Sequence, residues 1–256
     1  MEVFIYIILF IIGTLLGSFC TLAVYRIPLK QDITHERSYC PKCNHKLNFF
    51  DLIPLLSYIF LRGKCKYCKE KIRPRYFILE FFSGISLVLF GVSINLNLMQ
   101  LNDAKLLYFI FGTIYFVTLI LIAGIDKEYK KIQKSIIVFG VLALLPYILY
   151  LYILNPVNIY KYGICLLIML FLTIFNKFIN KCNYVIDILI FYIYMTLFSN
   201  AECMVFTTIL TLFAIAIKTI INKTRKQEEI KVPIGFYLCT FNVVIIIIQN
   251  FINNVM

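Results

Sequence analysis

Eight long apolar stretches run through this chain, and they constrain its fold more than any other feature. They cover residues 3–24, 77–95, 105–125, 135–154, 160–176, 184–199, 204–221 and 232–252. A helix of about 17 to 25 apolar residues crosses the hydrocarbon layer of a bilayer. Hydrophobic residues make up 61% of the 256 residues, which exceeds the share in soluble domains. The sequence therefore predicts an all-α, polytopic membrane bundle of about eight transmembrane helices.

The basic residues lie mainly in alternate connections between these stretches. The opposite connections contain only Lys105 and Lys161, whereas twelve, four, two and four Lys or Arg lie in residues 25–75, 126–134, 176–183 and 222–231. Loops rich in Lys and Arg stay in the cytoplasm. The sequence therefore predicts a multi-pass protein of the cytoplasmic membrane whose N terminus lies on the outer side. No basic segment precedes the first stretch, and we expect it to remain as a helix rather than to be cleaved as a signal.

This topology also accounts for the net charge of +12 without a nucleic-acid partner, so the bilayer is the expected partner. Arg26 and Arg75 bracket the longest polar loop. Basic side chains in such positions commonly anchor spans at the membrane surface, and we expect that role for both.

Two CxxC pairs lie in this loop, Cys40 with Cys43 and Cys65 with Cys68. Thiols are kept reduced in the cytoplasm, which favours metal ligation over a disulfide. Four thiolates satisfy the tetrahedral preference of zinc and leave no open position, so the sequence predicts a structural zinc-knuckle loop. The alternatives are four unliganded thiols or a redox pair, although no βαβ pattern accompanies the cysteines.

Three acidic residues lie within or at the edge of predicted spans: Glu80, Asp126 and Asp187. Ionisable residues are costly there and are candidates for function. Asp126 and Asp187 both lie near cytoplasmic ends, so packing can bring together two carboxylates that hydrolyse an amide by sharing a proton and activating water. Alternatively, Asp126 caps a helix, Asp187 is an interfacial residue at a helix start, and Glu80 pairs with Tyr76 or Arg75.

Several motifs in this order resemble the type IV prepilin peptidases, membrane aspartyl proteases of the GxGD kind. Residues 17–28 read GSFCTLAVYRIP, similar to the GSFLNVVIYRLP of that family. The loop keeps the order CPxC, IPLLSY and LRGKCxxC; residues 73–80, RPRYFILE, look like sRYxxxE; and residues 231–238, KVPIGFYL, look like IPFGPFL. The resemblance covers both halves of the chain.

The resemblance implies an eight-helix endopeptidase that removes the leader of prepilins or pseudopilins at the cytoplasmic face. In many members it also implies N-methylation of the mature pilin with S-adenosylmethionine, for which Glu80 is a candidate residue. The catalytic pair carries over to Asp126 and Asp187. The domain division is then 1–24 as the first transmembrane helix, 25–76 as the cytoplasmic loop with the four-cysteine zinc site, and 77–256 as the transmembrane peptidase domain.

The second aspartate motif departs from GxGD, because residues 184–190 read YVIDILI. Tyr184 and Ile186 replace both glycines, and Thr21 replaces the usual Asn of the first motif. Glycine permits close backbone approach and positive φ, which β-branched Ile resists. A catalytically impaired homologue therefore stays open as an alternative. So does a zinc-stabilised transporter or signalling subunit, although, apart from isolated Ser, Thr and Asn, the sequence shows neither the midplane polar residues nor the inverted repeats typical of transporters.

Overall fold

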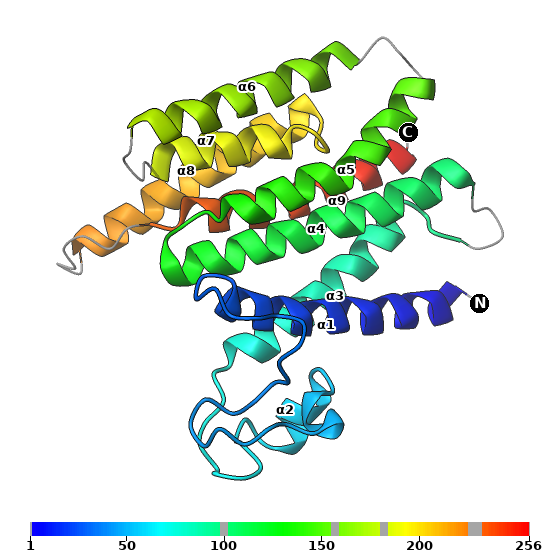
Figure 1. The fold of residues 1–256 in the computed structure, drawn as a ribbon. Coiled ribbons are helices and arrows are strands. Elements are labelled where there is room, and N and C mark those ends of the chain that lie inside the picture. Colours follow the sequence, from blue (N-terminus) through cyan, green and yellow to red (C-terminus); the bar gives the residue numbers. More distant parts are fainter. Residues whose placement is uncertain (1, 98–101, 155–158, 180–183, 225–231, 256) are drawn as a thin grey trace. The chain divides into compact units, whose positions relative to one another are not determined.

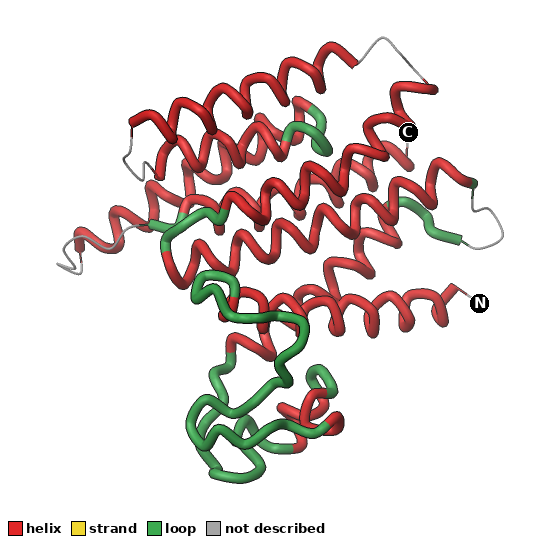
Figure 2. The backbone as a smooth tube through the Cα atoms, viewed as in Figure 1, coloured by secondary structure: helices red, strands yellow, loops and turns green. Residues whose placement is uncertain are grey.

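The computed structural model describes residues 2–97, 102–154, 159–179, 184–224 and 232–255. These residues form helices and loops (Figures 1 and 2). Two isolated β-bridges, Tyr39 with Lys46 and Lys64 with Lys71, lie in the loop after the first helix. The long helices are α1 Glu2–Arg26, α3 Arg75–Ser93, α4 Asp103–Tyr129, α5 Lys134–Leu154, α6 Ile159–Ile179, α7 Tyr184–Met195, α8 Ala201–Thr224 and α9 Ile234–Val255. Two short segments, the 3₁₀ turn η1 Phe49–Leu52 and the helix α2 Leu56–Phe60, lie in the loop between α1 and α3.

Each predicted apolar stretch corresponds to one of the long helices, and the all-α membrane fold is confirmed. Among the described residues, six helices are long and apolar enough to cross a membrane: α1, α3, α4, α5, α8 and α9. Helix α7 has only 12 residues, although the sequence predicted a span to residue 199. Its end is set by polar side chains, because Thr196 Oγ1 donates to the Ile193 carbonyl at 2.7 Å and Ser199 Oγ donates to Asn242 Oδ1 at 3.1 Å.

The chain divides into two compact units, Met1–Asn97 and Leu98–Met256. In the first unit, α1 packs against α3 through small residues. Gly13 and Gly17 form a GxxxG pair on α1, and they face Ser83 and Gly84 of α3. A Cβ at Gly13 would lie 2.8 Å from the Gly84 Cα, and one at Gly17 would clash with Ser83 Oγ. Small residues let helix backbones approach closely inside a membrane, so these four positions set the spacing of the pair.

In the second unit, α4 packs against α5 and α9, α8 packs against α9, and α6 packs against α7. A buried polar network joins four of these helices. Tyr115 of α4 donates to Asn242 Oδ1 of α9 at 2.8 Å, and Asn242 Nδ2 donates to Thr207 of α8 at 3.3 Å. Thr118 of α4 and Tyr194 of α7 share a hydrogen bond of 2.6 Å. Because unpaired polar groups are costly in hydrocarbon, these bonds fix the register of the helices.

Candidate functional site

The two CxxC pairs fold into two knuckles with the same backbone pattern. In the first, the Cys40 N–H donates to the His45 carbonyl at 3.0 Å and the Asn44 N–H donates to the Cys40 carbonyl at 2.8 Å. In the second, the Cys65 N–H donates to the Glu70 carbonyl at 2.8 Å and the Lys69 N–H donates to the Cys65 carbonyl at 3.0 Å. Asn44 and Lys69 follow the second cysteine of each pair and have φ values of 56° and 62°. Each turn thus aims two sulfurs to one side of the backbone.

The four thiol sulfurs gather at one point. The Sγ atoms of Cys40, Cys43, Cys65 and Cys68 all lie within 4.8 Å of one another, and those of Cys40 and Cys68 are 3.9 Å apart. Tetrahedral zinc with bonds of about 2.3 Å places its sulfurs about 3.8 Å apart. The four residues therefore fit a zinc ion, and such a closed set of thiolates has a structural role.

The surroundings of the thiols act on their protonation. Burial raises the pKa of Cys40, but hydrogen bonds from the Cys43 and Lys42 backbone outweigh it and bring the pKa to about 7. A backbone hydrogen bond from Glu70 lowers the pKa of Cys68, while burial and the adjoining thiols raise it to about 11. Four close thiols cannot all ionise together without a cation, which is the condition that metal binding relieves.

Arg26 organises the start of the loop, which differs from the expected surface anchor. Its side chain is only 2% exposed. The guanidinium donates to the carbonyls of Asp32 at 2.8 Å, Glu36 at 2.9 Å and Arg37 at 3.2 Å. The end of α1 therefore holds the loop in place by three charge-assisted hydrogen bonds.

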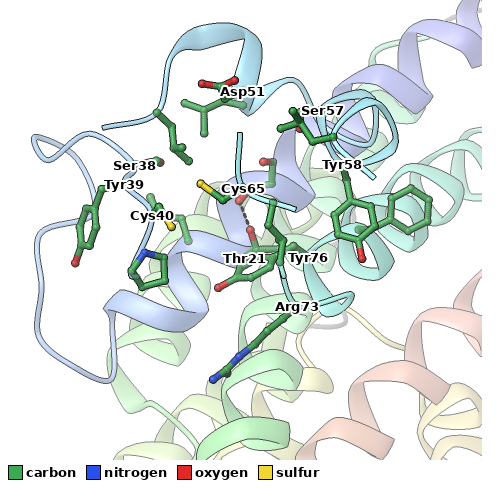
Figure 3. A pocket seen from close by; sticks show the side chains of 18 of the residues that line it. Thr21, Ser38, Tyr39, Cys40, Asp51, Ser57, Tyr58, Cys65, Arg73 and Tyr76 are labelled. Carbon is green, nitrogen blue, oxygen red and sulfur yellow. Dashed lines mark hydrogen bonds between the residues drawn. The ribbon is translucent and has the colours of Figure 1, made fainter. Parts of the chain in front are cut away.

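A cavity of about 680 Å³ lies between α1, α3 and the loop in the first unit, and Figure 3 shows Thr21, Tyr58, Tyr76 and Cys65 around it. Polar lining groups come from all three segments. The Glu80 carboxylate of α3 is buried and accepts a hydrogen bond from the Leu55 N–H at 2.9 Å. Leu55 has a φ of 60°, an uncommon conformation for a branched residue. Glu80 therefore fixes the loop backbone at this point.

Asp126 lies in the last turn of α4 and is fully buried. The Tyr184 hydroxyl donates to Asp126 Oδ1 at 2.6 Å, and the Phe236 N–H donates to Oδ2 at 3.0 Å. Tyr184 opens α7 and Phe236 lies in the first turn of α9. The positive end of the α9 dipole thus faces this carboxylate. Gly235 makes room for it, because a Cβ there would lie 3.2 Å from Asp126 Oδ2.

Asp187 lies in the first turn of α7, where the sequence placed it. Its Oδ1 is 3.1 Å from Lys134 Nζ at the start of α5, and the carboxylate side chain is 14% exposed. Asp187 follows Tyr184 by three residues, so the two lie on one face of the helix. The two aspartates are thus held at the same end of the second unit by different partners, and their pairing stays a prediction.

Sequence reasoning missed the roles of four residues in these two units: Arg26, Lys134, Tyr184 and Gly235. The available signal for Gly235 was the quoted motif at residues 231–238, which contains it. Lys231, the first residue of that motif, lies outside the described residues. Tyr184 was noted only as a lost glycine. Nothing local in the sequence indicates its bond to Asp126, 58 residues away, because that contact depends on helix packing.

Comparison with known proteins matches residues 11–94 to a family model described as the bacterial peptidase A24 N-terminal domain. A prepilin leader peptidase/N-methyltransferase of Vibrio cholerae is 46% identical over 86 residues, which is 30% of this chain and 34% of that protein. One from Bacillus subtilis is 31% identical over 158 residues, 61% of this chain and 58% of that protein. No solved structure gives a significant match.

A third relative with this name, from Myxococcus xanthus, is 42% identical over 77 residues, which is 30% of this chain and 23% of that protein. The matches to these three relatives therefore span less than two thirds of each relative's length. The residues matched by the family model include all of the quoted motifs of the first 80 positions from residue 17 onward. The comparisons confirm that this chain resembles the type IV prepilin peptidases.

Proposed function

We propose that this chain is an aspartyl endopeptidase that cleaves the leader of prepilins or pseudopilins at the cytoplasmic face of the membrane. The names of its relatives support prepilin processing. The membrane-spanning helices support a substrate that reaches the enzyme from the bilayer. Asp126 and Asp187 are the proposed catalytic residues.

The observation that carries the proposal is the contact between Asp126 and Tyr184. It joins the last turn of α4 to the first turn of α7, and Asp187 lies one helical turn further along α7. Residues three apart on a helix have Cβ atoms about 5 to 6 Å apart. Both carboxylates are therefore carried on the two helix ends that this hydrogen bond joins.

Such a pair supplies acid and base to amide hydrolysis. One carboxyl group holds a proton and donates it to the leaving nitrogen, while the other takes a proton from the attacking water. The α9 N–H groups beside Asp126 orient that carboxyl without using a mobile side chain. Asp187 is held instead by a side chain, through its ion pair with Lys134.

The test is leader cleavage of a prepilin encoded in the same genome and co-expressed with the chain. We expect Asp126→Asn and Asp187→Asn each to lower cleavage by about 10²-fold or more, since a carboxamide cannot exchange the proton. Asp103→Asn is the matched control, because Asp103 is an exposed aspartate in the first turn of α4. Unchanged cleavage in either proposed catalytic variant would reject the assignment of that residue.

A catalytically impaired homologue is the second candidate, and one observation favours it. Tyr184 replaces a motif glycine, and its hydroxyl donates a hydrogen bond to Asp126 Oδ1, an oxygen that a working dyad would use. The double change Tyr184→Gly with Ile186→Gly removes this hydroxyl and restores the glycines. An impaired enzyme should gain cleavage from it, whereas a working enzyme should change modestly or lose activity through lost packing of the buried Ile186.

We further propose that the loop cavity serves N-methylation with S-adenosylmethionine, as the names of the relatives suggest. Its volume lies in the range of cofactor pockets. Aromatic side chains and the buried Glu80 supply apolar surface and one carboxylate. Calorimetric binding of S-adenosylhomocysteine should be lost on Tyr58→Ala and kept on Tyr237→Ala, which lies on α9; equal binding by both variants would reject this cavity.

A further inference from the structure

Large apolar side chains cover the outer face of the two short loop segments. Phe49 and Phe50 of η1 are 76% and 78% exposed, and Phe60 of α2 is 79% exposed. Leu56 and Ile59 of α2 are 49% and 56% exposed. We call these five residues the loop patch. The two segments contact each other, and large apolar side chains exposed together in this way mark an interaction site, because solvated loops rarely carry them.

Helix α2 is amphipathic, but its apolar face is the exposed one. Leu56, Ile59 and Phe60 follow the i, i+3, i+4 spacing of one helix face. The other face carries Ser57 and Tyr58, which line the cavity of the first unit. The more polar face therefore points into the protein and the apolar face points away from it. This is the arrangement of a segment whose surroundings are apolar.

The position of α2 along α1 indicates what those surroundings are. Glu80 accepts a hydrogen bond from the Leu55 N–H, just before α2, and lines the same cavity as Ser18 of α1. Its Cα also lies 2.9 Å from the Cβ position at Gly17. Ser18 precedes the end of α1 at Arg26 by eight residues, or about 12 Å at 1.5 Å per residue. The start of α2 therefore lies level with the body of the α1 span and not beyond its end.

A transmembrane span of 24 residues is about 36 Å long, against about 30 Å of hydrocarbon. A point about 12 Å from the end of such a span lies at or below the level of the lipid headgroups. Irregular backbone at this depth requires internal partners for its polar groups. The bond from the Leu55 N–H to the buried Glu80 supplies one of them.

The charge of the loop matches a membrane surface. Residues 27–74 contain ten Lys or Arg and four Asp or Glu, a net charge of +6. Arg62 and Lys64 follow α2 directly and both are exposed. Anionic headgroups attract basic residues next to an inserted apolar segment, which strengthens its binding.

We propose that η1 and α2 lie in the interfacial layer of the bilayer, with the loop patch among the lipid acyl chains and Arg62 and Lys64 at anionic headgroups. The loop is then anchored in the membrane at its middle as well as at its two ends. The cavity between α1, α3 and the loop consequently lies at the membrane surface. This inference concerns the first unit and is independent of the peptidase assignment.

The chain contains no Trp, so single Trp variants report on single positions. Phe50→Trp and Phe60→Trp place the probe in the patch. His35→Trp is the matched control in the same loop, because the His35 side chain is 88% exposed. The full chain is reconstituted in phosphatidylcholine vesicles with and without phosphatidylglycerol. Emission is quenched either by brominated acyl chains or by aqueous acrylamide.

We expect the two patch variants to emit at shorter wavelength than His35→Trp and to lose most of their emission to brominated chains but little to acrylamide. Phosphatidylglycerol should increase the bromolipid quenching, and Arg62→Gln with Lys64→Gln should remove that increase. Quenching of the patch variants by acrylamide, as in the control, would overturn the proposal. Protection from both quenchers would also overturn it, because the patch would then be covered by protein.

Discussion

Tyr184 stands where the family motif has a glycine, and its hydroxyl joins three helix ends. It donates to Asp126 Oδ1 of α4 and accepts from the Ile234 N–H at 3.2 Å, where α9 begins. Asp126 is buried, and Tyr184 and Ile234 are half-buried, in a helical unit that is predicted to lie in the membrane. The Tyr184 side chain thus connects three helix ends by hydrogen bonds that a glycine at this position cannot make.

Tyr184→Phe keeps the ring and removes the hydroxyl. We expect a loss of stability of about 1 to 3 kcal/mol, because the Ile234 N–H is left without its acceptor and Asp126 loses a donor. The measurement is thermal unfolding of the purified protein in detergent. Tyr192→Phe on the same helix is the control. Equal melting temperatures for Tyr184→Phe and the unmodified chain would show that the hydroxyl contributes nothing to the packing.

Arg26 offers a second test at the scale of one residue. Arg26→Lys keeps the positive charge but loses the planar fork that reaches three carbonyls. We expect faster amide hydrogen exchange over residues 32–39, with unchanged exchange in α1. Arg37→Lys is the control, since the Arg37 side chain is exposed. Exchange in 32–39 that is no faster in Arg26→Lys than in the control would contradict the anchoring role.

At the scale of elements, α1 and α3 form a pair whose close approach depends on glycine. Gly17→Val places two methyl groups where Ser83 and the Glu80 backbone lie, so the helices must separate. We expect a lower melting temperature and faster reaction of Cys20, which is fully buried on α1, with a small maleimide. Gly163→Val is the matched control, because nothing lies within 4 Å of its Cβ position.

If Cys20 reacts equally in both glycine variants, close packing at Gly17 does not protect this part of α1. A loss of protein level in Gly17→Val alone would still support the steric argument, since the control makes the same substitution where nothing lies within 4 Å. Gly17→Ala provides a smaller step in the same direction and should give an intermediate effect. The order of the melting temperatures of the unmodified chain, Gly17→Ala and Gly17→Val therefore tests whether close spacing of α1 and α3 is needed at Gly17.

The two knuckles have the same backbone hydrogen-bond pattern, so we expect the loss of a cysteine from either one to have the same effect. The purified chain should hold about one zinc ion, and either Cys43→Ser or Cys68→Ser should release it. Metal loss should expose the backbone hydrogen bonds of both knuckles to exchange, including the one that was not changed, because one ion joins them. Cys165→Ser, on α6, should leave the zinc content unchanged.

Metal analysis after gentle purification gives the zinc content, and hydrogen exchange at residues 40–45 and 65–70 reports on the two turns. A variant that loosens only its own knuckle would indicate two independent turns without a shared ion. Absence of zinc from freshly prepared unmodified protein would reject the site altogether.

For the whole molecule, the sequence predicts elements better than contacts. The long helices follow from apolar length, which is a local property, and the cysteine cluster was predicted because one metal ion on the cytoplasmic side can bind both CxxC pairs. The bond between Asp126 and Tyr184 and that between Glu80 and Leu55 join residues 58 and 25 positions apart. Such contacts depend on packing, and no local pattern encodes them. The short helix α2 escaped prediction because five residues are too few for a periodic signal.

The last prediction concerns the topology of the whole chain in the membrane. It follows from the distribution of Lys and Arg, which places residues 25–75 and 126–134 in the cytoplasm. A tag inserted near Lys46 or Lys130 should be accessible only after the membrane is opened. A tag near Asn97, at the end of the first unit, should be accessible in intact cells.

These insertions also decide whether the proposed chemistry is feasible. Asp126 lies four residues before Lys130, and Asp187 is paired with Lys134 at the other end of the same short connection. Labelling of the Lys130 tag in intact cells would place both carboxylates outside, away from the zinc-knuckle loop, if the Lys46 tag stays protected. Cleavage of a leader on the cytoplasmic side would then be excluded. Protection of both tags keeps the loop and the aspartates on one side of the membrane, as leader cleavage requires.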